Sequence, residues 1–318
     1  MEIKKYQLAN EFMTVTFLDL GATIYKWEVN SLKRNIVLTN QDLSAYIDGS
    51  NTGFYGQTIG RVGNRIKDGK FSVNGIEYQT SKNYLHKHSL HGGNKGFWSQ
   101  IFKVKEEKDT LIFTYFSADK EEGYPGNLTL DVIYKLEGNT LLINYKATTD
   151  KATPLNITNH SYFRLSNNGN ILNDYLTISA DKILEVDNEL IPTGNFLDVK
   201  NTPFDFNKPR QLKDSLTLLK DTLNKGIDNH FVFTKPFLNL SSEDLSLDIT
   251  TSYPGVQIYS HNFTTPQLLD GNLKMQQHHG IAIEPQFEID SINQTYRDII
   301  LKPKQEYNEW IKYKLTLK

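Results

Sequence analysis

Residues 128–147 read LTLDVIYKLEGNTLLINYKA, and this stretch carries the clearest fold signal in the chain. Apolar side chains occupy every second position from Leu128 to Leu136 and again from Leu141 to Ala147. Side chains at every second position of a β-strand share one face of the sheet. Residues 137–140, Glu-Gly-Asn-Thr, interrupt the pattern and are typical of a turn. The stretch therefore predicts two adjacent antiparallel strands.

Working outward from this pair, short strands are predicted along the whole chain. Residues 71–78, FSVNGIEY, favour a hairpin because Asn74-Gly75 tolerates the positive φ angles of a type I′ turn. Arg210–Lys220 is the only fair helix candidate. Further strands are predicted at residues 12–18, 22–29, 35–39, 111–116, 175–179, 182–186, 231–234, 246–251, 256–259, 281–284 and 311–317.

The β–α alternation of a parallel sheet is missing, and so are linkers, repeats and low-complexity runs. The sequence therefore predicts an all-β fold, a large antiparallel sandwich or barrel-like domain that spans residues 1–318. A chain of 318 residues with 38% hydrophobic residues can bury a sizeable core.

Composition excludes several classes of function. The 35 Lys and Arg residues nearly balance the 37 Asp and Glu residues, so no basic surplus points to nucleic acid. The absence of cysteine excludes disulfides, thiolate catalysis and Cys-zinc sites. No apolar run approaches the ~20 residues of a membrane helix, and no signal peptide is evident at the N-terminus. We expect a cytoplasmic protein that binds neither nucleic acid nor membrane.

Two separate stretches offer an acid/base pair. Residues 154–165, PLNITNHSYFRL, place His160 in a polar cluster at the end of a strand pattern. Residues 280–286, GIAIEPQ, end an apolar run at Glu284. A carboxylate in a buried strand is costly unless it is paired or functional, and burial raises its pKa toward neutrality, which suits a general base. A purely structural role for His160 stays open at this point.

Residues 60–66, GRVGNRI, contain two glycines without the spacing of a dinucleotide-binding loop. One interpretation is a turn with exposed arginines. The other is that Asn64 and Arg65 donate hydrogen bonds to the oxygens of a ligand.

His86, His88 and His91 form an H-x-H-x-x-H pattern that raises the alternative of a metal site. No acidic residue lies close by in the sequence, and Gly92-Gly93 indicates a loop, so we favour a solvated loop for His86 and His88. The glycines let backbone approach closely, which can aim His91 into a cleft.

Asp228 in GIDNHF and Gln257 in PGVQIY are further polar groups in strand-like surroundings, where either can also cap a strand end. His278-His279 lies beside a turn and is expected to be exposed. Neither a nucleophile elbow nor a P-loop is present.

Together these segments resemble the aldose 1-epimerases, also called galactose mutarotases. The matching segments occur in the family's order and span most of the chain: GRVGNRI (60–66), FSVNGIEY (71–78), SLHGGNKGF (89–97), NITNHSYFRL (156–165), GIDNHF (226–231), PGVQIY (254–259) and IAIEPQ (281–286). The resemblance implies a one-domain β-supersandwich with an open cleft and neither metal nor cofactor. It also implies interconversion of the α and β anomers of a free aldose.

By motif, the resemblance implies Glu284 as general base and His160 as general acid. It implies substrate binding or charge stabilisation for Asn64, Arg65, His91, Asp228 and Gln257. The base takes a proton from the anomeric hydroxyl while the acid protonates the ring oxygen, and the opened sugar closes on the other face. We expect the two groups to lie on opposite sides of the sugar. Their reference pKa values, about 4.3 for Glu and about 6.5 for His, already favour these roles.

The chain departs from the family pattern at two places. Gly63 stands where members more often carry Ala, and residues 288–291, Glu-Ile-Asp-Ser, stand where Pro-Asp-Ala is usual. The second change is expected beside the site, so Glu284 and not Glu288 is the predicted base. The expected substrate is free galactose or glucose, with maltose as an alternative. No basic cluster for a hexose 6-phosphate is evident at the expected cleft.

Two hypotheses from other classes stay open, a non-catalytic carbohydrate-binding β-sandwich and a metal-dependent barrel enzyme. The expected partner is a free sugar alone, and the protein is expected to be a monomer or a homodimer.

Overall fold

The computed structural model of the chain describes residues 2–48, 50–51, 53–167, 169–264 and 267–318. One large sheet runs through the molecule, and every pairing between its strands is antiparallel. Its strand order is β10 (Lys103–Glu107), β11 (Thr110–Ser117), β12 (Leu128–Glu137), β13 (Thr140–Thr149), β27 (Tyr307–Leu317), β21 (Leu245–Thr251), β20 (Asp228–Ser241), β22 (Gly255–Tyr259), β25 (Ile281–Gln286) and β16 (Tyr162–Phe163).

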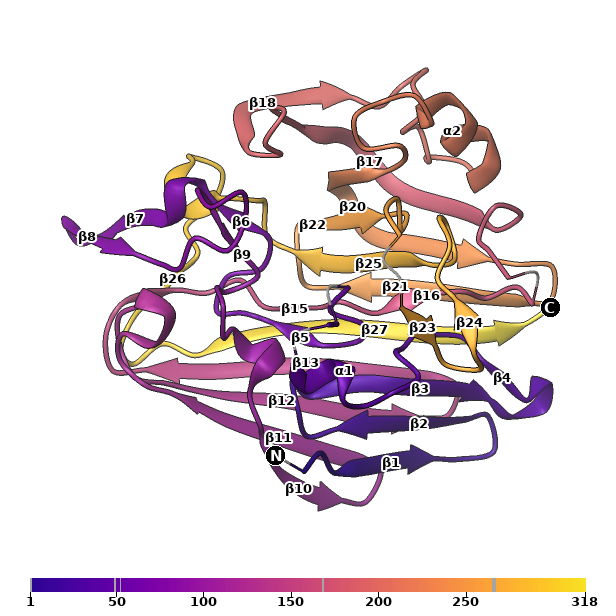
Figure 1. Ribbon diagram of the computed structural model, residues 1–318, viewed down its shortest axis with the longest axis horizontal. Helices are drawn as coiled ribbons and strands as arrows, with labels where there is room; N and C mark the ends of the chain where they lie inside the picture. The colour runs from indigo at the N-terminus through magenta and orange to yellow at the C-terminus, as the bar shows by residue number, and fades with distance from the viewer. Residues whose placement is uncertain (1, 49, 52, 168, 265–266) are drawn as a thin grey trace.

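Strand β17 (Tyr175–Val186) branches from this order because it pairs with β20, and β18 (Pro192–Asp198) and β19 (Arg210–Gln211) pair with β17. A second, four-stranded sheet consists of β1 (Lys5–Ala9), β2 (Met13–Leu18), β3 (Thr23–Val29) and β4 (Arg34–Asn35). In Figure 1 this indigo sheet lies beside β11 and β12, whereas β17, β18 and α2 lie at the opposite end of the molecule.

Short two-stranded ladders and helical turns complete the described chain. The ladders are β5 (Thr58–Ile59) with β15 (Thr158–Asn159), β6 (Arg65–Ile66) with β9 (Ser89–Leu90), β7 (Lys70–Val73) with β8 (Ile76–Gln79), β14 (Thr153–Pro154) with β26 (Ile300–Leu301), and β23 (Leu268–Leu269) with β24 (Leu273–Lys274). The helices are α1 (Ala45–Asp48), α2 (Leu212–Leu219) and the 3-10 turns Asn30–Leu32, Lys67–Gly69, Phe97–Ser99, Glu121–Gly123 and Ser291–Asn293.

The strand pair that the sequence showed best is confirmed. Leu136 lies opposite Leu141 and Leu128 opposite Thr149, so the pair β12–β13 is in the expected register. The alternating apolar side chains of β12 are buried, as a half-buried strand requires. The 71–78 hairpin is confirmed as well, because Asn74 and Gly75 adopt φ angles of 53° and 77° between paired Val73 and Ile76.

The core lies between the two sheets and is rich in aromatic side chains. The ring centroid of Phe17 on β2 lies 4.5 Å from that of Tyr134 on β12, and the Trp27 ring on β3 lies 5.7 Å from Tyr313 on β27. Trp27 is fully buried. Aromatic pairs of this kind contribute about 0.5–1.5 kcal/mol each beyond their buried area, so they fix how the small sheet sits on the large one.

Several element predictions differ from the structure. Two strands were expected within residues 175–186, but β17 is one strand whose pairing with β20 shifts register at Ile178–Ala180 and Ala180–Lys182. The strand expected at 35–39 is confined to Arg34–Asn35. Three edge strands, β1, β10 and β18, were not predicted. The predicted helix is confirmed as α2.

Three neighbouring strands position the cleft residues described next. Along β20, β22 and β25 the register pairs Asp228 with Tyr259 and Gln257 with Glu284. Within the described part of the chain, no helix has both the length and the apolar character needed to cross a bilayer.

Candidate active site

A row of polar side chains crosses the three strands β20, β22 and β25. The Nε2 atom of Gln257 donates a hydrogen bond to Oδ1 of Asp228 over 2.6 Å. Gln257 in turn lies opposite Glu284 in the ladder. Burial raises the pKa of Asp228, while the positive charge of Arg65 and the Gln257 hydrogen bond act in the opposite direction. The row therefore holds two carboxylates in one low-dielectric place.

Glu284 is the more deeply buried of these carboxylates. It is 2% exposed, and all its neighbours on β25 are buried. Its Oε2 atom has no hydrogen-bond partner among the described residues. Burial raises the pKa of Glu284 well above its ordinary value, the nearby Asp228 raises it further, and Arg65 lowers it. The strand position and its burial agree with the prediction from the sequence.

His160 lies between β15 and β16, and the backbone fixes its place. Its N–H donates to the carbonyl of Gln57, and its carbonyl accepts from the N–H of Gly56. The imidazole Nε2 lies 3.4 Å from Oε1 of Glu284. The two side chains thus lie next to each other, and the expectation that they act from opposite sides of a sugar stays a prediction. The anomeric hydroxyl and the ring oxygen are both bonded to C1, so adjacent groups can reach both.

Burial lowers the pKa of His160 to about 4. Sequence reasoning used the ordinary value of about 6.5 and missed this shift. Loss of hydration disfavours charge on both members of the pair, so a proton is held more tightly by Glu284 and more loosely by His160. Because the two side chains are in contact, the protonation of one affects the other, and the apparent pKa values belong to the pair.

His91 is placed by a left-handed backbone turn and by Asn64. The backbone N–H of Asn64 donates to Nδ1 of His91 over 3.3 Å, so the ring proton sits on Nε2. Burial, and then the charges of His160 and Arg65, lower the pKa of His91 well below its ordinary value. His91 is thus a neutral hydrogen-bond donor. Gly92 makes this turn possible, since a Cβ there would lie 1.9 Å from the carbonyl oxygen of Gly60.

Arg65 is held in the same group of residues. Its Nη1 donates to Oδ1 of Asn64 over 2.9 Å, and its guanidinium lies 4.5 Å from the centre of the Tyr84 ring. Arg65 is 8% exposed, and its Nε has no partner among the described residues. The interpretation of residues 60–66 as a turn with exposed arginines is therefore wrong. Arg61 is buried too, but it binds the carbonyls of Pro125 and Gly126.

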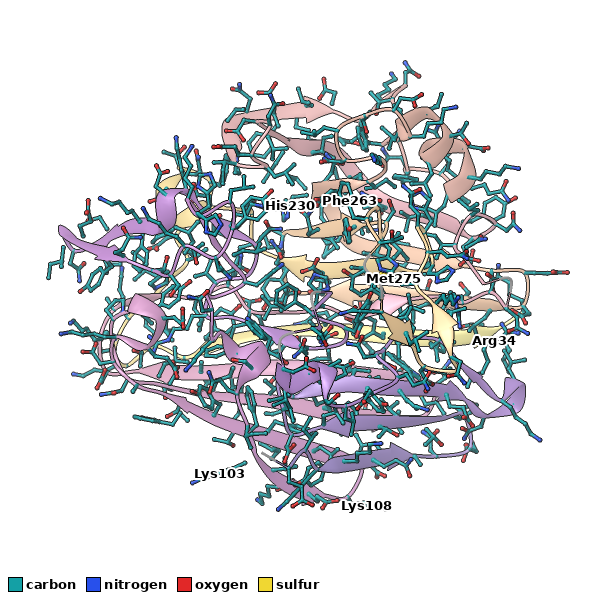
Figure 2. The ribbon with its side chains drawn as sticks, in the orientation of Figure 1. Arg34, Lys103, Lys108, His230, Phe263 and Met275 are labelled. Carbon is teal, nitrogen blue, oxygen red and sulfur yellow. The ribbon has the colours of Figure 1, made fainter. Side chains whose placement is uncertain are left out.

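All seven site residues predicted from the sequence line one cleft of about 300 Å³. Sequence reasoning gave no role to several other lining residues. Tyr162 and Tyr259 lie within quoted motifs, whereas Phe54, His261, Phe263 and Met275 had no signal beyond residue type. Phe263 and Met275 come from the segment after β22 and are labelled in Figure 2. The Phe54 ring packs against His91 and His160, with centroid distances of 4.9 and 5.9 Å.

The histidine pattern at residues 86–91 does not form a metal centre. Among the described residues, no group of three or more His, Asp or Glu side chains could hold a metal ion. His86 is exposed, as expected. The expectation of a solvated His88 is wrong, because His88 is 1% exposed, accepts from the N–H of Asp68 at Nδ1 and contacts Glu189 with Nε2 over 3.1 Å. His279 was also expected to be exposed and is buried.

Comparison with known proteins gives a consistent result. The sequence model of a family described as aldose 1-epimerase matches residues 4–314. A galactose mutarotase of Pongo abelii is 36% identical, with 99% of this chain and 95% of the relative covered. An aldose epimerase homologue from C. elegans has a TM-score of 0.93 at 30% identity, with 99% of both chains covered. A galactose 1-epimerase from Lactobacillus acidophilus has a TM-score of 0.89 at 26% identity, with 100% of this chain and 95% of that chain covered.

Proposed function

The chain belongs to the aldose 1-epimerase family of isomerases, which interconvert the anomers of hexoses, and we propose that Glu284 and His160 carry this reaction on free galactose or glucose. The single observation that supports these roles best is the contact between the two side chains in the cleft, 3.4 Å from Nε2 to Oε1. Their roles are those expected from the sequence, with Glu284 as base and His160 as acid.

The proposed reaction moves two protons and breaks one carbon–oxygen bond. The carboxylate of Glu284 takes the proton of the anomeric hydroxyl, and His160 gives its proton to the ring oxygen as the bond between C1 and that oxygen breaks. The product is the open aldehyde, with Glu284 protonated and His160 neutral. Rotation about the C1–C2 bond presents the other face of the aldehyde, and the reverse transfers close the ring as the other anomer.

The environment of the pair favours the product of this step, with the proton on Glu284 and His160 neutral, so ring opening starts from the less populated form in which the proton lies on His160. The raised pKa of Glu284 makes the carboxylate a better proton acceptor, and the pKa of about 4 makes protonated His160 a better donor. The pair carries one proton before and after ring opening, so no net charge enters the buried site. Each positioned proton transfer typically contributes about 10²–10⁴-fold in rate.

The remaining predicted residues are proposed to bind the sugar and to stabilise charge. His91 donates from Nε2, and the unpaired Nε of Arg65 supplies a charged donor for an oxygen that gains negative charge. Asp228 accepts from sugar hydroxyls, with Gln257 fixing its carboxylate. Asn64 acts through its hydrogen bonds to His91 and Arg65 as well as on substrate. Aromatic side chains such as Phe54 offer apolar faces to the sugar ring.

We also propose that residues 1–318 act as one domain, since the large sheet takes strands from Lys103 to Leu317. A cytoplasmic protein that works as a monomer or a homodimer, with neither nucleic acid nor membrane as partner, stays a prediction.

Polarimetry tests the proposed function directly. α-D-Galactose, α-D-glucose and α-maltose are dissolved separately, and optical rotation is followed with and without the protein. Faster relaxation of galactose or glucose than of the protein-free solution is expected. Faster relaxation of maltose alone would move the substrate to a disaccharide. If none of the three sugars relaxes faster, the proposal fails, and a non-catalytic sugar-binding role becomes the hypothesis to test.

A further inference from the structure

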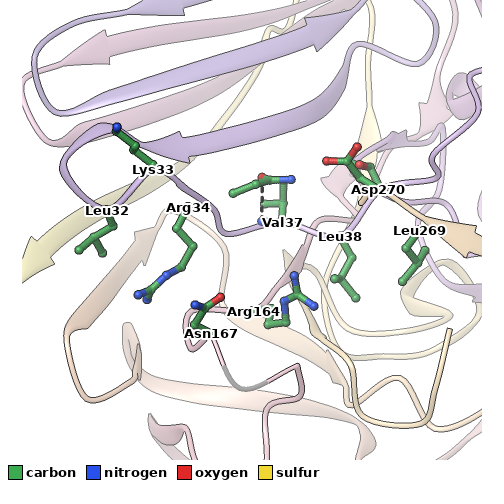
Figure 3. Close-up of a pocket in the computed structure, with 11 residues that line it drawn as sticks. Leu32, Lys33, Arg34, Val37, Leu38, Arg164, Asn167, Leu269 and Asp270 are labelled. Atoms are coloured by element: carbon green, nitrogen blue, oxygen red, sulfur yellow. Dashed lines mark hydrogen bonds between the residues drawn. The ribbon is translucent and has the colours of Figure 1, made fainter. Parts of the chain in front are cut away.

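A second pocket, of about 220 Å³, lies away from the catalytic cleft and is lined by cationic side chains. It forms where the end of the small sheet meets the segment after β16 and the β23–β24 hairpin. Lys33, Arg34 and Arg164 contribute three positive charges to its lining, and Asp270 contributes one negative charge. Figure 3 draws this pocket, with Arg164 between Asn167 and Leu38 in the view.

Arg164 is the unusual member of this group. Its side chain is partly buried, and it makes no hydrogen bond, ion pair or ring contact with any described residue. Burial lowers the pKa of its guanidinium. Burial, and then the positive charge of Arg164, lower the pKa of the nearby His279. A guanidinium that loses water without gaining a partner is costly, which points to a ligand that supplies one.

Two of the other charges around the pocket, those of Arg34 and Asp270, already have partners. Arg34 forms a bidentate ion pair with Asp244, with N–O distances of 2.9 and 2.6 Å. Asp270 is paired with Nζ of Lys26 over 3.0 Å. Neither acid is therefore left to neutralise Arg164. Exposed Lys33 likewise has no ion pair among the described residues. The positive charges of Lys33 and Arg164 therefore have no ion-pair partner in the described part of the chain.

Asn35 adds a neutral donor with a fixed orientation. Its Oδ1 accepts from the backbone N–H groups of Trp27 and Val37, over 3.0 and 3.3 Å. Because both partners are N–H donors, the atom that accepts these two bonds is the amide oxygen, and the other end of the amide is the Nδ2 donor group. Nδ2 has no hydrogen-bond partner among the described residues, and Asn35 lines the pocket.

We propose that this pocket binds a small phosphate-type oxyanion, held by the guanidinium of Arg164 and the Nδ2 group of Asn35, with Lys33 completing the charge balance. A guanidinium presents its donors in a planar fork that matches two oxygens of a phosphate. The two uncompensated cations match the two charges of a phosphate dianion. The phosphate belongs either to the free ion or to a phosphorylated sugar.

This site is separate from the catalytic cleft. Of the residues that the structure describes, none lines both cavities. An apolar cluster stands between them, in which Leu38 and Leu269 from the oxyanion pocket pack with Tyr162 from the cleft. The proposal therefore does not depend on which sugar the cleft takes.

Isothermal titration calorimetry of the full chain tests the proposal, with inorganic phosphate as the probe in a buffer free of phosphate and sulfate. We expect saturable binding to the unchanged protein with a Kd near or below about 1 mM. Arg164→Gln should weaken it at least about tenfold, the effect of losing a charge-assisted hydrogen bond. Asn35→Asp keeps the acceptor for Trp27 and Val37 but replaces the donor by a negative charge, so it should abolish binding.

Lys103→Gln is the matched control. Lys103 is exposed on β10, and Figure 2 shows it well away from Arg34, so its loss removes one unit of charge without touching the pocket. Phosphate affinity should be unchanged in this variant. The proposal is overturned if the unchanged protein shows no saturable phosphate binding. It is also overturned if Arg164→Gln and Asn35→Asp both bind phosphate as tightly as the unchanged protein. If Arg164→Gln does not fold, Asn35→Asp alone decides.

A second titration, with glucose 6-phosphate, identifies the source of the phosphate. Tighter binding than inorganic phosphate, lost in Asn35→Asp, assigns the site to a phosphorylated sugar. Equal binding, lost in the same variant, assigns it to the free ion. Glucose 6-phosphate binding that survives both substitutions, without any phosphate binding, places the anion elsewhere and contradicts the proposal.

Discussion

Nε2 of His160 lies 3.4 Å from Oε1 of Glu284, although the two residues come from distant parts of the sequence. The sheet explains the contact. β16 starts two residues after His160 and pairs with β25, so that Tyr162 lies opposite Ala282 and Glu284 follows on the same strand. The positions of these two side chains are thus set by the register of one antiparallel ladder, and their separation depends on backbone hydrogen bonds more than on flexible loops.

Replacement of Glu284 by Gln should lower kcat by about 10²–10⁴-fold, because the amide cannot accept the proton of the anomeric hydroxyl. Shape and burial are retained, so KM should change little. Glu288→Gln is the matched control, since Glu288 is also buried but contacts Arg297 and does not line the cleft. Polarimetric rates of both variants are compared. Equal losses in the two variants would contradict the choice of Glu284 as base.

The pH profile of kcat/KM should keep its plateau well below pH 6.5. The active pair carries one proton. Because burial lowers the pKa of His160 to about 4, the pair takes up its second proton only as the pH falls through about 4. The alkaline limb follows loss of the last proton, which the raised pKa of Glu284 delays. Both apparent values belong to the pair. An acidic limb centred near about 6.5, the ordinary value for histidine, would contradict this environment.

Stability toward acid should depend on His230. Burial lowers its pKa to about 3, and neither ring nitrogen has a partner among the described residues. In the unfolded chain His230 has the ordinary pKa of about 6.5, so between about pH 6.5 and about pH 3 the unfolded state binds more protons than the folded state. The stability that the neutral, buried His230 contributes is complete above pH ~6.5 and is lost as the pH falls toward about 3. His230→Leu should flatten the fall of the unfolding free energy over that window.

Urea denaturation of both proteins between pH 7 and pH 4 measures the effect. Burial also lowers the pKa values of His160 and His261, so part of the dependence of the unfolding free energy on pH should remain in the variant. An unchanged slope would show that His230 takes up no proton on unfolding.

Gly92→Ala should lower both stability and activity. Its φ of 85° strains any side chain, and the added Cβ would meet the carbonyl of Gly60 at 1.9 Å, which displaces the neighbouring His91. Gly75→Ala is the control, with a similar φ of 77° and no atom within 4 Å of the added Cβ. The free energy of unfolding of the control should fall only by the backbone strain of a side chain at positive φ, about 1–2 kcal/mol. If denaturant titration shows the same decrease in the free energy of unfolding for both variants, the contact between the added Cβ and Gly60 has no effect and the explanation is contradicted.

Much of the fold could be predicted because its central strands bury one face. In β12 and β13 the alternation of apolar side chains is directly visible in the sequence. Edge strands lack this signal. In β18 all residues after Pro192 are exposed, and Lys103–Glu107 of β10 holds a single apolar residue, so neither has a periodic apolar pattern. β17 was split into two predicted strands because its register shifts interrupt the alternation.

The candidate site could be predicted as far as its residues sit in motifs, and all seven predicted residues line the cleft. The contacts between them could not be predicted. Arg65 lies opposite Leu90 in the β6–β9 ladder but packs on Tyr84, which precedes β9, and Phe54 reaches His91 and His160 from a loop. The lowered pKa of His160 was missed for the same reason, since burial of a side chain depends on segments far away in the sequence.

The most direct measurement is a double-mutant cycle on the contact between His160 and Glu284. Rates of galactose mutarotation are measured for the unchanged protein, Glu284→Gln, His160→Asn and the double variant, by polarimetry at neutral pH. If the two groups transfer protons in one concerted unit, the double variant should be about as slow as either single variant, as for other residues that act together. Two independent losses that multiply in the double variant, or a near-normal rate in either single variant, would contradict the proposed pair.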